Sequence, residues 1–257
     1  MLQCAALFIE DQTFFSCYEP RPQEPQSAAT QLIQGIFESF PEQALTYLRR
    51  PLWLSYPPSL MDRGMIAVAA KRYRFDPHLS RKLSESDSRK QQIRYQLNNN
   101  DCFGSPMSIE RGLSWLREES KSDCAPSRLY ERDREIRALL IDEKHEVLLM
   151  AKNGNSQNKT KHAEVVLLQE YYLRFQKGFE QQMTLVTSLQ CCKMCAAMVW
   201  HMHLDPWKNL KVFYSKPELG PSARDTILTA GGNLRREVAR DAQQLALVIE
   251  MKLDGRF

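Results

Sequence analysis

Two cysteines separated by two residues form the local pattern that most constrains this chain. The stretch SLQCCKMCAAMV at 188–199 contains three of the seven cysteines, and Cys192 and Cys195 form a Cys-x-x-Cys pair. The β-branched and apolar segment at 183–189 predicts a strand before the pair, and the Ala- and Met-rich run after it predicts a helix. The strand therefore leads into a helix whose first turn carries both sulfurs on one face, where the helix N-terminus favours thiolates.

A Cys-x-x-Cys pair alone fits several kinds of site, including thioredoxin-like redox centres and half of a zinc ribbon. The seven cysteines are an odd number spread along the chain, which argues against a full disulfide framework and favours reduced thiols or metal ligands. No apolar run approaches the roughly 18 residues that a membrane span needs. The N-terminal segment at 1–12 lacks a basic n-region and a sustained h-region. We therefore expect a cytoplasmic protein without a membrane partner.

A histidine thirty residues before Cys192 supplies a third metal ligand. His162 and Glu164 open the segment KHAEVVLLQEYY, whose apolar stripe predicts a helix facing a core. One imidazole and two thiolates make three zinc ligands and leave the fourth tetrahedral position to water. Zinc lowers the pKa of such a water to about 7, and a nearby carboxylate that is not a ligand can shuttle its protons. We therefore predict a catalytic Zn²⁺ held by His162, Cys192 and Cys195, with Glu164 as the acid–base residue.

The His-Ala-Glu motif followed by Cys-x-x-Cys resembles the zinc-dependent cytidine deaminase superfamily. The match is closer to the tRNA-specific adenosine deaminases, whose strand, Cys-x-Met-Cys, Ala-rich helix and next strand are similar to residues 184–200 and 210–216. Residues 137–164 resemble the family's β-hairpin, its Asn-containing turn and the loop into His-Ala-Glu. The resemblance covers about residues 133–217.

The resemblance implies roles for residues beside the metal. Asn153 matches the asparagine that contacts the target ribose; Asn155 competes for this role, and the Asn-Gly-Asn stretch is also typical of a plain turn. Ala163 and Cys191 are assigned to substrate binding. Cys191 replaces the family's proline, so it keeps the backbone carbonyl aimed at the exocyclic amine without the fixed φ. A fourth protein ligand would close the site, which favours a structural role for the Cys191 thiol. Gln190 replaces a commonly acidic residue.

An internal repeat relates the two halves of the chain. Three stretches match in order, at separations of 132, 135 and 133 residues: 5–19 with 137–151, 27–34 with 162–169, and 52–67 with 185–200. The first copy lacks the ligands, with Ser27, Ala29, Ser59 and Asp62 in place of His162, Glu164, Cys192 and Cys195. Serine is a poor zinc ligand and one aspartate will not hold the ion. The first copy is thus interpreted as a degenerate deaminase-like domain, the alternative being a chance similarity of two α/β segments.

These patterns predict an α/β protein of two cytidine-deaminase-like, three-layer α/β/α domains, each with a mixed five-stranded sheet, the N-terminal one degenerate. The predicted units are a pseudo-domain over 1–80, a helical basic connector over 81–130 and a catalytic zinc deaminase domain over 131–257. We expect the last two strands of the second sheet to run parallel.

Three further segments have predicted structures. Residues 80–97 and 108–120 predict helices around a loop, and 233–257 predict an amphipathic helix followed by a strand near its end. Residues 71–94 carry eight lysines and arginines against three acids. This excess either follows the phosphates of a nucleic acid or forms a solvated helix face.

The resemblance implies a hydrolytic deaminase acting on RNA, with adenosine converted to inosine in tRNA. Family members of this kind act as dimers, and the eukaryotic form pairs a working subunit with an inactive one, so the two halves would form an intramolecular pseudo-dimer. One alternative is a cytidine-to-uridine deaminase acting on RNA, single-stranded DNA or a free nucleotide, because attack on cytosine uses the same apparatus. Another is a non-catalytic, zinc-stabilised nucleic-acid-binding module in which Cys191 or His201 fills the fourth position.

Overall fold

The computed structural model describes most of the chain, in the ranges 1–70, 72–95, 102–103, 107–117, 135–154, 158–231 and 234–236. The first half contains, in chain order, β1 (Gln3–Ile9), β2 (Gln12–Tyr18), α1 (Ala28–Ser39), α2 (Ala44–Tyr47), β3 (Leu52–Leu54), α3 (Leu60–Met65), a π-helical turn (Ile66–Ala70), β4 (Tyr73–Phe75), α4 (Leu79–Ser84) and β5 (Lys90–Gln92). The sheet has the order β4-β3-β1-β2-β5. It is mixed, since β1 pairs antiparallel with β2 and β3, whereas β3–β4 and β2–β5 are parallel.

The second half has the same kind of architecture. Its elements are β6 (Cys102–Phe103), β7 (Met107–Ser108), α5 (Ile109–Arg117), β8 (Arg137–Ile141), β9 (Glu146–Lys152), α6 (Ala163–Phe175), β10 (Met183–Leu189), α7 (Lys193–His201), α8 (Pro206–Asn209), β11 (Leu210–Lys216), a 3-10 turn (Pro221–Ala223), α9 (Ile227–Ala230) and β12 (Leu234–Arg236). Five of its strands form the order β12-β11-β10-β8-β9, and the short β6 and β7 both pair with β9.

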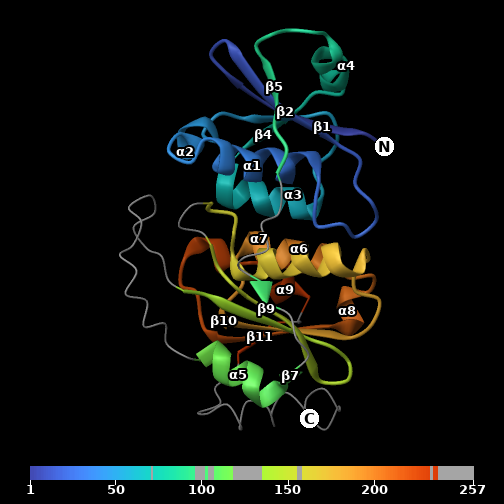
Figure 1. The fold of residues 1–257 in the computed structure, drawn as a ribbon, viewed down its shortest axis with the longest axis vertical. Coiled ribbons are helices and arrows are strands. Elements are labelled where there is room, and N and C mark those ends of the chain that lie inside the picture. The colour runs from blue at the N-terminus through green and yellow to red at the C-terminus, as the bar shows by residue number, and fades with distance from the viewer. Residues whose placement is uncertain are drawn as a thin grey trace.

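The helices of the two halves face each other between the sheets (Figure 1). Helices α1 and α3 lie on the inner face of the first sheet, and α6 and α7 lie on the inner face of the second. The outer face of the second sheet is covered by α5, whose Ile109, Leu113 and Leu116 share a core with Leu139 and Phe213 among others. The outer face of the first sheet is covered by α4. Each half is therefore a three-layer α/β/α unit, and the predicted fold class is confirmed. The second sheet has seven strands where five were predicted, because β6 and β7 both pair with β9.

The repeat in the sequence corresponds to a repeat in topology. Four adjacent strands follow the order β4-β3-β1-β2 in the first sheet and β11-β10-β8-β9 in the second. Ala6 pairs with Trp53, and Leu139 pairs with Val186 in the equivalent strands. The first strand is thus related to its counterpart by 133 residues, and the separation of 132 taken from the sequence is wrong by one. The difference matters because a shift by one residue exchanges the two faces of a strand.

The helix predicted over 80–97 is wrong. Helix α4 ends at Ser84, and the chain then enters β5, which pairs with β2. Asp87 accepts hydrogen bonds from the backbone and side chain of Arg89 and so forms a turn. The Lys90 ammonium then donates to carbonyl groups near the end of α4. The first sheet therefore extends beyond the predicted boundary at residue 80, and residues placed in the connector over 81–130 contribute strands to both sheets.

The helix predicted over 233–257 is also wrong at its start, because residues 234–236 form β12. This strand pairs in parallel with β11, whose edge would otherwise expose unpaired backbone groups. Helix α9 lies in the crossover between β11 and β12. The strand that the sequence predicts to run parallel to β11 is the later one near the end of 233–257, so its parallel orientation stays a prediction. Residues 237–257, including the strand predicted there, lie outside the described residues. None of the helices in the described ranges has the length and hydropathy of a membrane span.

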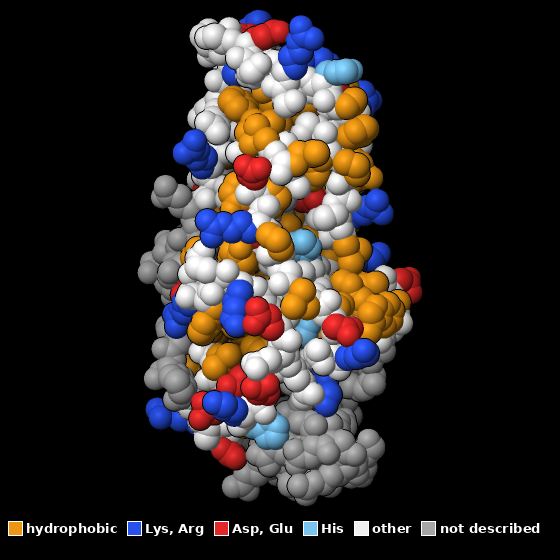
Figure 2. Space-filling model, turned by 90° about the vertical axis from the view of Figure 1, so that its right-hand side faces the viewer, with side chains coloured by type: hydrophobic (Ala, Val, Ile, Leu, Met, Phe, Trp, Pro, Cys, Tyr) orange, Lys and Arg blue, Asp and Glu red, His pale blue; other side chains and the backbone are white. Residues whose placement is uncertain are grey.

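Part of the basic excess over 71–94 is neutralised within the segment itself. Lys82 lies 2.7 Å from Asp76, and Arg89 lies 2.9 Å from Asp87. Over the molecular face shown in Figure 2, basic and acidic side chains are interspersed with hydrophobic ones. These pairs favour a solvated charged surface for this segment over a continuous phosphate-binding track.

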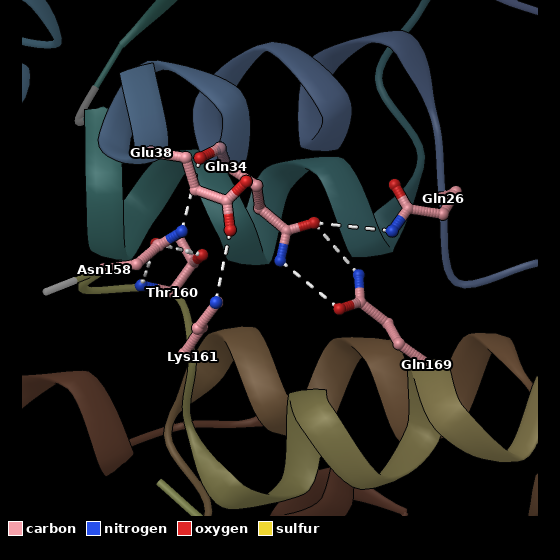
Figure 3. Close-up of polar contacts among 7 residues, drawn as sticks. All are labelled: Gln26, Gln34, Glu38, Asn158, Thr160, Lys161 and Gln169. Carbon is pink, nitrogen blue, oxygen red and sulfur yellow. Dashed lines mark hydrogen bonds and ion pairs between the residues drawn. The ribbon is translucent and has the colours of Figure 1, made fainter. Parts of the chain in front are cut away.

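The two halves meet through residues that are counterparts in the repeat. Gln34 on α1 and Gln169 on α6 bond each other through both amides, at 2.9 and 3.4 Å (Figure 3). Lys161 lies 3.1 Å from Glu38, and the Asn158 amide donates to the Gln34 carbonyl. Contact between a residue and its own counterpart is the property of a two-fold interface. The two domains are therefore arranged about an approximate two-fold axis.

Helices α3 and α7 approach each other closely because residue 64 is a glycine. A Cβ atom at Gly64 would lie 2.7 Å from the Lys193 carbonyl oxygen and 2.8 Å from the Ala197 Cβ. We expect Gly64→Val to lower the free energy of unfolding by about 1–3 kcal/mol, because the helices must separate. Urea denaturation measures this change. Gly220→Val is the matched control, since the nearest atom there belongs to the flexible Glu218 side chain; equal effects of the two substitutions would contradict the close packing.

Candidate metal centre

The structure brings His162, Cys192 and Cys195 together at the N-termini of two neighbouring helices. His162 is the N-cap of α6 and Cys192 is the N-cap of α7, while Cys195 lies in the first turn of α7. Strand β10 ends just before this helix, as its apolar β-branched sequence predicts. The Nδ1 atom of His162 lies 3.6 Å from the Cys192 sulfur and 3.4 Å from the Cys195 sulfur, and 3.5 Å separate the two sulfurs.

These distances fit a tetrahedral zinc site. With Zn–S bonds of about 2.3 Å and Zn–N bonds of about 2.0–2.1 Å, tetrahedral angles place two sulfurs about 3.8 Å apart and a nitrogen about 3.6 Å from each sulfur. All three ligand atoms lie within 4.8 Å of one another. No other group of three metal-ligating side chains occurs within the described ranges. The cluster could therefore hold a metal, and its donor set of one imidazole and two thiolates is suited to zinc.

The charges of the three groups are coupled. Burial disfavours the charged form of His162, but the charge and hydrogen bond of Cys192, together with the charge of Glu164, outweigh it and raise the pKa of the imidazole to about 9. The hydrogen bond between the Cys192 and Cys195 sulfurs, together with the charge of His162, holds the pKa of Cys192 well below its usual value. Burial and the adjacent thiolate raise the pKa of Cys195 well above its usual value. A thiolate is thus already favoured here without a metal, and binding of a cation would displace the remaining protons.

Glu164 lies beside the cluster without belonging to it. Its side chain is 3% exposed, in the first turn of α6, and its Oε2 atom has no hydrogen-bond partner among the described residues. Burial raises the pKa of this carboxyl group, and the Cys192 thiolate adds to the effect, against the opposing influence of His162. A buried polar atom without a partner is costly. The geometry therefore suits a carboxyl group whose partner is a molecule bound in the site.

Cys191 and His201 lie outside the ligand cluster. Cys191 is fully buried, and burial together with the charge of Glu164 raises the pKa of its thiol well above the usual value. The Nε2 atom of His201 lies 3.1 Å from the backbone carbonyl of Glu24, across the domain interface. The alternative in which either residue closes the metal site as a fourth ligand therefore finds no support in these positions.

The residues assigned to substrate binding are placed as follows. Ala163 is buried at the start of α6. Asn153 follows β9, where its backbone N–H donates to the Ile136 carbonyl and its Oδ1 accepts from the Ile136 N–H. This pairing fixes the end of the hairpin. Asn155 lies outside the described residues. The contact of Asn153 with a ribose, and the substrate-binding roles of Ala163 and Cys191, stay predictions.

The equivalent position in the first domain contains a hydrogen-bonded cluster in place of the three ligands. Ser27 and Ser59 are helix N-caps, and Asp62 is the third residue of α3, as Cys195 is of α7. The Ser27 hydroxyl donates to Asp62 at 2.5 Å and the Ser59 hydroxyl donates to it at 2.8 Å. Tyr56, which no sequence pattern indicated, also belongs to this cluster. Its hydroxyl accepts from the Ala29 N–H and lies 3.4 Å from Asp62. The buried carboxylate is thus satisfied without a metal.

Comparisons with known proteins assign part of the chain. Residues 127–239 match the family of Bd3614-like deaminases. A structure from a study of A-to-I editing by tRNA:A34 deaminases is 15% identical, with 40% of this chain and 82% of that chain covered and a TM-score of 0.30. The guanine deaminase from Nitrosomonas europaea is 14% identical, with coverages of 61% and 90% and a TM-score of 0.34. No curated protein sequence matches the chain.

Proposed function

Because residues 127–239 match the family of Bd3614-like deaminases, we propose that the protein is a zinc-dependent hydrolytic deaminase of a nucleobase in RNA, with adenosine in tRNA as the substrate. The observation that carries the proposal is the position of Glu164. A buried carboxyl group with an unsatisfied oxygen lies beside three side chains that suit zinc. A purely structural metal site has no use for such an acid, whereas a hydrolytic site needs one.

The chain's own residues divide the proposed chemistry between them. When bound, a zinc ion supplies a hydroxide nucleophile at neutral pH, because it lowers the pKa of its water to about 7. His162, Cys192 and Cys195 hold the ion in place. Glu164 takes a proton from the attacking water and delivers it to the ring nitrogen of the base. A second proton transfer through Glu164 assists the departure of ammonia, and the exocyclic C–N bond is replaced by C=O. The raised pKa of Glu164 suits this exchange.

We further propose that the first domain acts as the inactive half of an intramolecular pseudo-dimer. Its Ser27, Ser59 and Asp62 bond to one another and do not form a metal site. The reciprocal Gln34–Gln169 contact supports a two-fold arrangement of the halves. A second domain without catalytic residues extends the surface beside the site, which a polymeric substrate needs more than a free nucleoside does.

Product analysis tests the function. The zinc-loaded full chain is incubated with total tRNA, other RNA, single-stranded DNA, and free nucleosides and bases; the nucleic acids are then digested and analysed by mass spectrometry. We expect inosine from tRNA, formed about 10²- to 10⁴-fold more slowly by the Glu164→Gln protein. Uridine in place of inosine would identify cytidine as the target. Absence of any deaminated product from zinc-loaded protein would contradict the proposal and favour the binding module.

A further inference from the structure

A cavity of about 260 Å³ lies between the two domains, and one of its lining residues is adjacent in sequence to a residue of the metal cluster. The first domain contributes Arg63 and Ala67 to it, and the second contributes Lys193, Ala197, Asp225 and Ile227 among others. In the sequence, Lys193 directly follows Cys192 of the metal cluster. We infer that this cavity binds one nucleotide unit, with its phosphate between Arg63 and Lys193. The inference deepens the proposed function and rests on it, because it assigns a subsite for the RNA beside the target base.

The charges of the cavity favour an anion. Arg63 is exposed and Lys193 is half-buried, and neither forms an ion pair with any described residue. Asp225 is the one acid among the described lining residues, and no ion pair joins it to Arg63 or Lys193 in the described part of the chain. Two uncompensated cations on opposite domains suit a phosphate, which accepts charge-assisted hydrogen bonds from both sides.

The remaining surface of the cavity suits a base and a sugar. The walls of the cavity are mainly apolar and are formed by Leu60, Ala67, Ala197 and Ile227. The face of a base can pack against them. The Asp225 carboxylate is placed to accept from a ribose hydroxyl or an exocyclic amine. The cavity volume of about 260 Å³ lies just below the roughly 300 Å³ at which pockets for drug-sized ligands start, so it leaves room for no more than one nucleotide unit.

The subsite exists only when the two domains pack together. Arg63 belongs to α3 and Lys193 to α7, and these helices approach closely through Gly64 and Ala197. The domain without metal ligands would thus supply half of a substrate subsite. This arrangement also gives a reason for retaining its helix layer after the loss of its ligands.

Binding measurements on the full chain test the inference. A fluorescein-labelled oligoribonucleotide is titrated with the zinc-loaded protein, and 5′-AMP and adenosine are titrated as competitors, so that RNA and free nucleotide are distinguished as sources of the phosphate. We expect Arg63→Ala to weaken oligonucleotide binding about tenfold or more. It should also reduce the slope of affinity against salt by about one counterion. The control Arg49→Ala removes an exposed arginine of the same domain outside the cavity, and we expect less than a twofold change.

A second variant separates the charge from the shape of the cavity. Ala67 is exposed, so Ala67→Trp fills the cavity without removing a cation or a core side chain, and it should weaken binding to a similar degree. If Arg63→Ala and Ala67→Trp both bind like the native protein while inosine is formed, the subsite is wrong and the deaminase function stands. If no substrate is deaminated but binding depends on Arg63 and on the phosphate, the subsite stands and the function is wrong.

Discussion

The Glu164→Gln protein is expected to keep one zinc ion per chain and to deaminate its substrate about 10²- to 10⁴-fold more slowly than the native protein. Glutamine has nearly the same shape as glutamate, so it leaves the packing of the first turn of α6 in place. It cannot take or give the proton that the reaction moves. The ligand cluster does not include Glu164, which is why metal content and catalysis should separate. Steady-state rates and metal analysis of the same preparation measure both quantities.

A second buried glutamate on the same helix provides the matched control. Glu170 is 3% exposed and bonds Arg174 at 2.5 Å, one helical turn further on. Glu170→Gln removes a buried carboxylate from α6 at a position outside the metal cluster, so it should affect stability more than turnover. If Glu164→Gln were as active as Glu170→Gln, another group would have to move the protons.

The metal ligands could be predicted from the sequence because each of them belongs to a local sequence pattern. His162 and Cys192 are each the cap of a helix, and Cys195 follows Cys192 by one turn, so strand and helix signals placed each ligand on its element. The contact between the two helix ends is not local. It was expected from the resemblance to a family, since spacing alone leaves the 30 residues between His162 and Cys192 free to adopt other arrangements.

Contacts between distant segments account for what the sequence did not predict. Residues 90–92 have little β-propensity, and they form a strand because the edge of β2 pairs with them. Gln34 and Gln169 lie on predicted helices, but their mutual bond depends on the packing of two domains. Tyr56 joins Ser27 and Asp62 only in the folded domain. The repeat could suggest that the first domain lacks the three ligands, but not that hydrogen bonds connect the residues at the corresponding positions.

Substitution of Cys195 is expected to have the second large effect, because it removes one of the three metal ligands. Two remaining donors, His162 and Cys192, hold zinc far more weakly than three, and Cys191 lies outside the cluster and is not placed to substitute. At free zinc 1,000 times above its dissociation constant, a bound ion stabilises the folded state by about 4 kcal/mol. We therefore expect Cys195→Ala to be purified without stoichiometric zinc and to melt about 10 °C lower than the native protein.

Cys191→Ala distinguishes a ligand from a neighbouring buried cysteine. Both thiols are fully buried and four residues apart, so their truncation leaves cavities of similar size. Only Cys195 lies within ligand distance of His162 Nδ1 and the Cys192 sulfur. Metal analysis and thermal melting with and without added zinc should therefore show a zinc-dependent rise in Tm for Cys191→Ala and none for Cys195→Ala. If Cys195→Ala kept full zinc occupancy, or if Cys191→Ala lost its zinc, a different set of sulfurs would hold the ion. The open fourth position of the zinc site would then lie elsewhere.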